Sequence, residues 1–223
     1  MARAAPPRGS TRWRPYLLPI ASLLVFAVLM VAISLTITNT LDADVLLALR
    51  RRASPWLTHV MVVVTYLGTW PVVLVVALAY ALITRGRANV DLVYLLGAAA
   101  GGGALSLLLK NLIQRPRPDP VAALVLAGGF SFPSGHALLS LVFYGTLVRI
   151  LAGHIQSRRC AFLLYLAGAL LIVAIGFSRL YLGVHYLTDV LAGYAIGEAW
   201  LSALALLVRR RFRRDHPPTC ASP

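Results

Sequence analysis

The sequence contains 223 residues, 59% of them hydrophobic, and has a mean hydropathy of +0.79. These values exclude an ordinary soluble domain. The formal net charge of +14 does not indicate nucleic-acid binding, because the basic residues lie at the ends of apolar segments, where membrane topology explains them.

Six apolar segments are long enough to cross a bilayer, which requires about 20 mainly apolar residues. Backbone groups in lipid must be hydrogen-bonded within their own segment, so each segment is predicted to be an α-helix. The predicted fold class is therefore all-α, a polytopic membrane protein with six transmembrane helices in one bundle, at residues 16–38, 57–83, 91–112, 136–152, 161–177 and 186–208. The predicted organisation is a cytoplasmic N-terminal tail at 1–15, a transmembrane domain at 16–208 and a basic cytoplasmic tail at 209–223.

The first segment follows Arg3, Arg8, Arg12 and Arg14, as the apolar part of a signal peptide would. A signal peptide carries an apolar run of about 7–15 residues, whereas this run extends over 16–38. We therefore predict an uncleaved helix.

Charge sets the predicted topology. With the N-terminus inside the cell and six alternating spans, 14 of the 21 basic residues fall on the cytoplasmic side. The positive-inside rule then places both termini in the cytoplasm. The cluster Arg50–Arg52 is an exception on the outer side, and the segment LDADVLLALRRR that contains it is predicted to be an interfacial amphipathic helix.

Three polar segments interrupt the apolar sequence, and the alternating topology places all of them at the extracytoplasmic face. They are KNLIQRPRPDP at 110–120, PSGH at 133–136 and SRLYLGVHYLTD at 178–189. The chain has a single lysine, Lys110, and it lies in the first of these segments. Charges near a membrane are costly, so this convergence indicates a functional site.

The cations of these segments favour an anionic ligand. Lys110, Arg117 and Arg179 are accompanied by only two nearby carboxylates, Asp119 and Asp189. Arginine binds phosphate oxygens through a planar fork, and lysine acts as a point charge. The sequence therefore predicts a site for a phosphate-like group.

The segment PSGH stands directly before an apolar helix. Free backbone N–H groups and the positive end of the helix dipole attract anions at such a position. Ser134 and Gly135 are therefore predicted to bind the anion, with Ser134 as a simple N-cap as the alternative.

His185 and Asp189 are spaced i, i+4 and so meet on one helix face. A carboxylate that holds Nδ1–H leaves Nε2 free to act as a base or nucleophile. Such a pair is weak evidence for a catalytic site by itself, and it becomes stronger evidence together with the two other segments that are suited to binding phosphate.

The order K-x6-R-P, P-S-G-H and S-R-x5-H-x3-D resembles the three-part signature of the type 2 phosphatidic acid phosphatase superfamily. The residues that carry the resemblance are Lys110, Arg117 and Pro118; Pro133, Ser134, Gly135 and His136; and Ser178, Arg179, His185 and Asp189. The resemblance implies that His185 forms a phosphohistidine, that Asp189 orients it, and that His136 protonates the leaving oxygen. It implies that the phosphoryl oxygens are held by Lys110, Arg117, Ser134, Gly135 and Arg179.

The resemblance implies a metal-independent hydrolase with no cofactor, no nucleic-acid partner and no obligatory protein partner. The only partner that it implies is the substrate of the enzyme, a lipid phosphate or diphosphate in the membrane. The Arg-rich, Lys-poor chain indicates a bacterial cytoplasmic membrane, where undecaprenyl diphosphate and phosphatidate-type lipids are the expected substrates, the first being favoured. The alternatives are a phosphatase of a small soluble phosphate ester and a non-enzymatic transporter, which would distribute charges through several spans.

Other polar residues fall outside the signature. Arg115 is predicted to be auxiliary or merely interfacial, and Glu198 to have a structural role, paired with another helix or protonated. The loop 119–132 contains the apolar run Val121–Ala127, which is expected either to admit the lipid or to pack against a neighbouring helix. Three further histidines are expected to be interfacial or exposed, His59, His154 and His216.

Overall fold

The structure is a computed structural model that describes residues 14–85, 89–119 and 123–215. These residues form eight α-helices and no strand. The helices are α1 (Arg14–Ser34), α2 (Asn39–Arg51), α3 (Pro55–Tyr66), α4 (Trp70–Thr84), α5 (Asn89–Ile113), α6 (Gly135–Gly153), α7 (Arg158–Tyr181) and α8 (Leu187–Asp215).

Five helices, α1, α5, α6, α7 and α8, are each long and apolar enough to cross a membrane. Helices α3 and α4 qualify as a sixth span when they are taken together. The all-α, membrane-spanning architecture is therefore confirmed. The short helix α2 forms where an interfacial amphipathic helix was predicted.

The predicted continuous helix at 57–83 is wrong, because this span is bent by 57° between α3 and α4. Pro71 lies in the first turn of α4 and lacks the N–H that would continue an α-helix from before it. Thr69 precedes this turn with an extended backbone. The break faces Gly103 of α5 and the start of α6, where a cavity described below is found.

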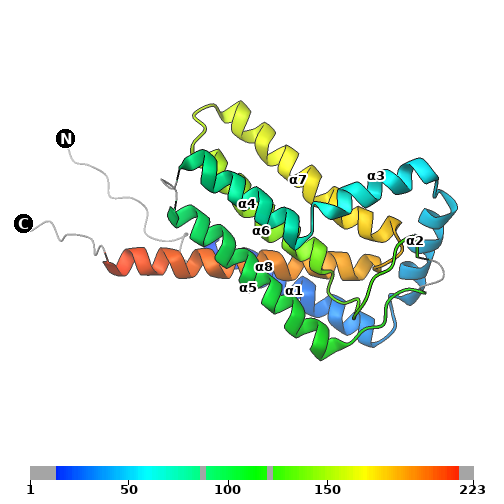
Figure 1. Cartoon of the computed structure of the whole chain (residues 1–223). Coiled ribbons are helices and arrows are strands. Elements are labelled where there is room, and N and C mark those ends of the chain that lie inside the picture. Colours follow the sequence, from blue (N-terminus) through cyan, green and yellow to red (C-terminus); the bar gives the residue numbers. More distant parts are fainter. Residues whose placement is uncertain (1–13, 86–88, 120–122, 216–223) are drawn as a thin grey trace, which may run out of the picture.

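Helix α6 lies at the centre of the bundle and packs against α5, α7 and α8 (Figure 1). Half of its membrane-spanning window is buried, compared with 11% for α1, which packs along α8 at the periphery. The buried side chains between these helices include Leu138, Val142 and Phe143 of α6. A central α6 gives its N-terminus a fixed position in the fold.

Gly193 allows α8 to approach the N-terminus of α6. A Cβ atom at this position would lie 2.7 Å from the carbonyl oxygen of Ser134, which is closer than real Cβ contacts allow. The approach is stabilised by the backbone N–H of Ser134, which donates to the carbonyl oxygen of Asp189 at 2.9 Å. Two of the predicted site segments are thereby joined.

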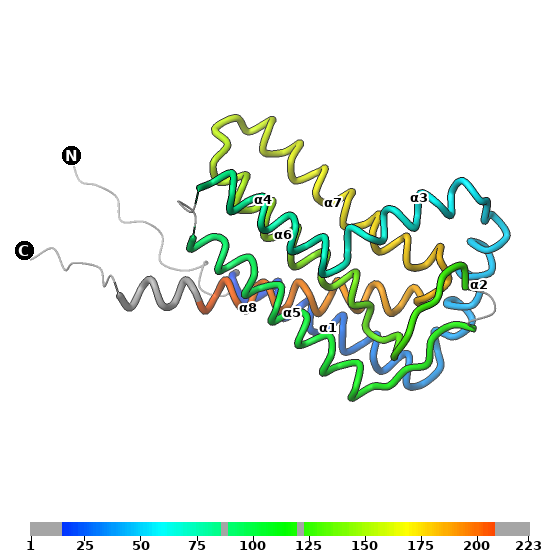
Figure 2. The backbone as a smooth tube through the Cα atoms, in the orientation of Figure 1, coloured from blue at the N-terminus to red at the C-terminus, as the bar shows by residue number. Residues whose placement is uncertain are grey.

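The polar segments converge at one end of the bundle, here called the site end. Helices α5 and α7 end there, α6 and α8 begin there, and α2 lies beside them (Figures 1 and 2). Helix α1 begins and α8 ends at the opposite end of the bundle.

Candidate active site

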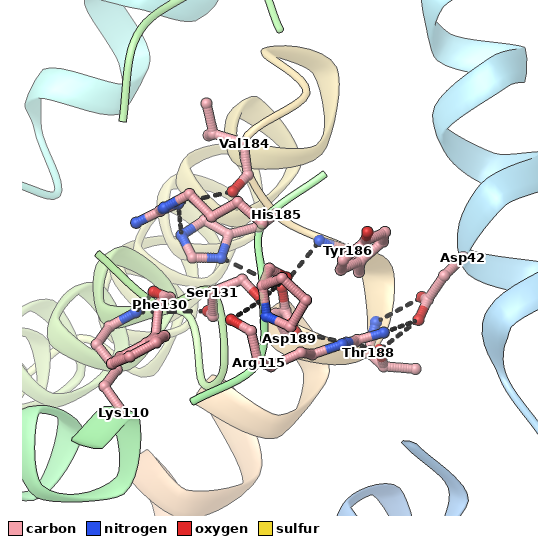
Figure 3. A network of polar contacts seen from close by, with 12 residues as sticks. Asp42, Lys110, Arg115, Phe130, Ser131, Val184, His185, Tyr186, Thr188 and Asp189 are labelled. Atoms are coloured by element: carbon pink, nitrogen blue, oxygen red, sulfur yellow. Dashed lines mark hydrogen bonds and ion pairs between the residues drawn. The ribbon is translucent and has the colours of Figure 1, made fainter. Parts of the chain in front are cut away.

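His185 lies in the short connection between α7 and α8 and is almost completely buried. Its Nδ1 is 3.4 Å from Oδ2 of Asp189, in the first turn of α8 (Figure 3). The same oxygen accepts the backbone N–H of Tyr186 at 2.9 Å. The i, i+4 spacing therefore produces the predicted contact between the histidine and the carboxylate.

Arg117 contacts the other nitrogen of this ring, with Nη1 3.3 Å from Nε2 of His185. A guanidinium group only donates hydrogen bonds, so Nε2 must be the acceptor and Nδ1 must carry the proton. Arg117 is held in place by donating to the carbonyl oxygens of Gly128, Gly129 and Val184 at 2.7–3.1 Å. The geometry thus selects the tautomer whose Nε2 lone pair faces a cation.

Burial governs the protonation of this pair. Burial, opposed by Asp189 and aided by the charges of Arg179 and Arg117, lowers the pKa of His185 to about 4. Burial also lowers the pKa of Arg117, against the raising effect of Asp189. His185 is therefore a neutral imidazole at neutral pH.

Two further cations lie close to this pair. Nζ of Lys110, near the end of α5, donates to the carbonyl oxygens of Phe130 and Ser131 at 2.6 and 3.4 Å (Figure 3). Nη1 of Arg179, at the end of α7, donates to Oγ1 of Thr65 at 2.7 Å. Nε of Arg179 is buried and has no hydrogen-bond partner among the described residues.

Ser134 occupies the N-cap position of α6, but its side chain makes no capping hydrogen bond. Its Oγ is buried and also lacks a partner within the described part of the chain. The alternative in which Ser134 is only a side-chain cap is therefore wrong. Buried polar atoms are normally satisfied, so Oγ of Ser134 and Nε of Arg179 are available to an oxygen-rich ligand.

Gly135 and His136 complete the cluster at the start of α6. A Cβ atom at Gly135 would meet Oγ of Ser106 at 3.3 Å and the side chain of Lys110 at 3.9 Å. The charges of Arg179, His185, Arg117 and Lys110 all act on the ring of His136. Every residue that the sequence predicted for the site therefore belongs to one cluster.

Cavities open on two sides of this cluster. One of about 360 Å³ adjoins Arg117 and is lined mainly by Ala123, Val125, Leu126 and Ala127. The other, of about 320 Å³, adjoins His136 and lies at the α3–α4 break, against Trp70 and Gly103. Both are lined mainly by apolar side chains, which suits an apolar ligand.

The sequence did not predict the role of Arg115 or Asp42. Arg115 is 9% exposed, so the alternative in which it is merely interfacial is wrong. It forms ion pairs with Asp189 at 2.6 Å and with Asp42 of α2 at 2.8 Å (Figure 3). The sequence offered little signal, because Asp42 is one of two acidic residues in the first half of α2.

The remaining polar residues lie apart from the cluster. Glu198 accepts a hydrogen bond from Ser202 and lies 3.8 Å from Arg149 of α6, so it pairs with another helix. His59 and His154 are exposed, and His216 lies outside the described residues. No group of three or more potential metal-ligating side chains is found in the described part of the chain.

The bundle and the cation-rich histidine site at its end define a multi-pass membrane protein with excess positive charge around a neutral imidazole. The chain belongs to the PAP2 superfamily, whose family model matches residues 91–213. This confirms the family that the three-part signature predicted. Membership also agrees with the phosphatase names of its relatives.

Phosphatidylglycerophosphatase B of Bacillus subtilis (strain 168) is 32% identical over 181 residues, which cover 80% of this chain and 89% of the relative. The crystal structure of a transmembrane PAP2-type phosphatidylglycerolphosphate phosphatase from Bacillus subtilis matches with a TM-score of 0.81 and 30% identity, over 86% of this chain and 96% of that chain. An undecaprenyl-diphosphatase of Sulfolobus acidocaldarius is 35% identical over 79 residues, which are 35% of this chain and 34% of the relative.

Proposed function

We propose that this protein is a lipid phosphatase that transfers a phosphoryl group from a membrane lipid to Nε2 of His185 and then to water. The observation that carries the proposal is the arrangement around His185, with Asp189 at Nδ1 and Arg117 at Nε2. This arrangement presents an unprotonated nucleophile, oriented by a third group, next to a cation. Phosphoryl transfer requires such positioning together with stabilisation of negative charge.

The reaction has two steps. In the first, the Nε2 lone pair of His185 attacks phosphorus, the P–O bond to the lipid breaks, and His136 donates its proton to the departing oxygen. A bound phosphate favours the protonated form of His136 by its negative charge. In the second, His136 takes a proton from water, the resulting hydroxide attacks phosphorus, and the N–P bond breaks to release phosphate and His185.

The phosphoryl oxygens would be held by Lys110, Arg117, Arg179, Ser134 and the backbone N–H of Gly135. The unpartnered Nε of Arg179 and Oγ of Ser134 support this assignment. These fixed cations supply the charge stabilisation that a divalent metal supplies in other phosphatases, so the proposed catalysis is metal-independent. Residues 16–208 are proposed to form the phosphatase domain, with tails at 1–15 and 209–223.

The proposed substrate is the phosphate monoester of a glycerophospholipid, with phosphatidylglycerophosphate first. The name of the Bacillus subtilis relative and its coverage of 89% of that chain support this choice. Undecaprenyl diphosphate is the second candidate, supported by the shorter match to the Sulfolobus acidocaldarius relative. We further propose that both termini are cytoplasmic and that the site end faces the outer leaflet of the cytoplasmic membrane.

The test is phosphate release by purified protein in detergent. The substrates would be dioctanoyl phosphatidylglycerophosphate, dioctanoyl phosphatidate, farnesyl diphosphate and glycerol 3-phosphate. We expect release from the lipids, with loss of release in His185→Ala. His59→Ala is the matched control, because His59 is an exposed histidine of α3 that is not one of the proposed site residues. Full activity of His185→Ala would contradict the mechanism, and activity on glycerol 3-phosphate alone would indicate a soluble substrate.

A further inference from the structure

A buried ion-pair network lies behind Asp189, and it reaches a helix far away in the sequence. Arg115 donates from Nη1 to Oδ1 of Asp189 at 2.6 Å and from Nη2 to Oδ2 of Asp42 at 2.8 Å (Figure 3). Its guanidinium carbon lies 4.2 Å from the ring centroid of Tyr186, in a cation–π contact. Arg115, Asp42 and Asp189 are all buried, so these charges depend on one another rather than on water.

Asp42 also fixes the first turn of α8, which carries Asp189. Its Oδ1 accepts the backbone N–H of Thr188 at 3.1 Å, and its Oδ2 accepts the Thr188 hydroxyl at 2.6 Å. The first N–H groups of a helix have no partner within the helix. An acidic side chain of α2 therefore caps α8 from outside and holds the turn in which Asp189 lies.

The two oxygens of Asp189 are divided between the network and the catalytic histidine. Oδ1 accepts from Arg115, while Oδ2 faces Nδ1 of His185 and accepts the N–H of Tyr186. This division fixes the rotation of the carboxylate, so that one oxygen always faces His185. Among the described residues, the Arg115 side chain contacts Thr188, Asp189, Asp42 and Tyr186, and none of these contacts involves Oγ of Ser134 or Nε of Arg179.

The charges of the network have a chemical consequence. One guanidinium stands between two buried carboxylates, Asp42 and Asp189, and its removal leaves two negative charges without a cation. Two such carboxylates cannot both remain ionised at low cost. If Asp189 takes up the proton, it no longer accepts fully from Nδ1–H, and His185 loses the tautomer that keeps Nε2 unprotonated.

We propose that Asp42 and Arg115 are positioning residues for the reaction, because they hold Asp189 ionised and in the rotation that directs His185. The inference rests on the proposed function of His185. Under this proposal α2 has a role in catalysis, since it supplies Asp42, one end of the network that orients the nucleophile.

The first test compares the kinetics of purified variants on dioctanoyl phosphatidate, with vanadate as an inhibitor. We expect Arg115→Gln to lower kcat by about 10- to 100-fold, by analogy with the loss of the hydrogen-bond partners that orient histidines in metal sites. KM and the inhibition constant of vanadate should change by less than about twofold, the range for uncoupled sites. Arg117→Gln, which removes a proposed phosphate contact, should instead raise both constants.

Two milder variants keep the test decisive if Arg115→Gln does not fold. Arg115→Lys keeps the charge but not the planar fork, so it should restore part of kcat. Asp42→Asn should lower kcat less than Arg115→Gln, again without changing vanadate inhibition. Arg149→Gln is the matched control, because it removes an arginine that pairs with Glu198 near the C-terminal end of α6, whereas the site lies at the N-terminal end of this helix.

The second test does not depend on activity. The ¹⁵N shifts of His185 in detergent micelles report its tautomer, and we expect the Nδ1–H form in the unaltered protein and a mixture of tautomers in Arg115→Gln. If the unaltered protein hydrolyses no lipid phosphate, the proposed function fails. The tautomer measurement still tests whether Arg115 directs His185 through Asp189. Unchanged kcat and tautomer in folded Arg115→Gln would overturn it. A rise in the vanadate constant equal to that of Arg117→Gln would also overturn it, because Arg115 would then be a phosphate ligand.

Discussion

Nη1 of Arg117 lies 3.3 Å from Nε2 of His185, so a cation adjoins the nitrogen that is proposed to attack phosphorus. A single contact therefore places the nucleophile, His185, next to Arg117, the residue that would hold a phosphoryl oxygen. Binding of the phosphate by Arg117 would bring phosphorus next to Nε2, which is the positioning that phosphoryl transfer requires.

The first prediction concerns the protonation of His185. Because burial, aided by Arg179 and Arg117, lowers its pKa to about 4, the ring should stay neutral down to about pH 5. In the unfolded chain the same ring becomes charged below about pH 6.5, so the folded state should lose stability as the pH falls from about 6.5 to about 4. NMR titration of the histidine ring protons in micelles measures this, with His185→Gln to assign the signal. A midpoint near 6.5 would contradict the buried environment.

Much of the site was predictable because the three polar segments lie at the ends of membrane spans. Alternating the spans across the membrane places all three segments on the same side of it. Lys110, Ser134 and His185 needed only that topology. Asp42 was not predictable, since it is one of two acidic residues in a helix expected to lie at the interface, and Thr188, its partner, is 146 residues away. The bend before Pro71 was missed because hydropathy treats 57–83 as one apolar run, although Gly68 and Pro71 mark a possible break.

The second prediction separates the two histidines of the site. His136→Ala should slow hydrolysis of an alkyl phosphate by about 10²- to 10⁴-fold, because a poor leaving group needs protonation by a general acid. An aryl phosphate with a good leaving group should be affected much less. Steady-state rates on dioctanoyl phosphatidate and 4-nitrophenyl phosphate measure the difference. Equal losses on the two substrates would exclude His136 as the acid.

The third prediction is that activity persists in excess chelator and is inhibited by vanadate. Lys110, Arg117 and Arg179 provide positive charge around the proposed phosphate position without a metal. Phosphate release would be measured after dialysis against EDTA, with and without added Mg²⁺. Activity that disappears on chelation and returns with Mg²⁺ would contradict the proposed catalysis.

The fourth prediction concerns the loop 119–132 that was expected to admit the lipid, of which residues 119 and 123–132 are described. Leu126 is 96% exposed at the rim of the cavity beside Arg117. Leu126→Ser should raise KM for a long-chain phosphatidate by about tenfold or more, since burial of a leucine side chain contributes about 1.5–3 kcal/mol and about 1.4 kcal/mol is a factor of ten. A dioctanoyl substrate should be affected less.

Leu124 provides the matched control for this loop. It packs against Tyr181, Leu182 and Val184, and its N–H donates to the carbonyl oxygen of Leu182 at 2.9 Å. Leu124→Ser should therefore lower Tm and affect both substrates alike. If Leu126→Ser also affects both chain lengths equally, the exposed leucine does not contact the lipid chain.

The last prediction concerns the side of the membrane that the site end faces. Leu126 lies at the site end, whereas the exposed Cys160 lies in the first turn of α7, at the opposite end of the bundle. In Leu126→Cys/Cys220→Ser, an impermeant maleimide added to intact cells should label position 126 and spare Cys160, because the excess of basic residues favours a cytoplasmic position for the Cys160 end. Cys160 should react only after the cytoplasmic membrane is permeabilised, and Cys160→Ser identifies its signal. Labelling of Cys160 in intact cells, with position 126 protected, would place the site in the cytoplasm and exclude an outer-leaflet substrate.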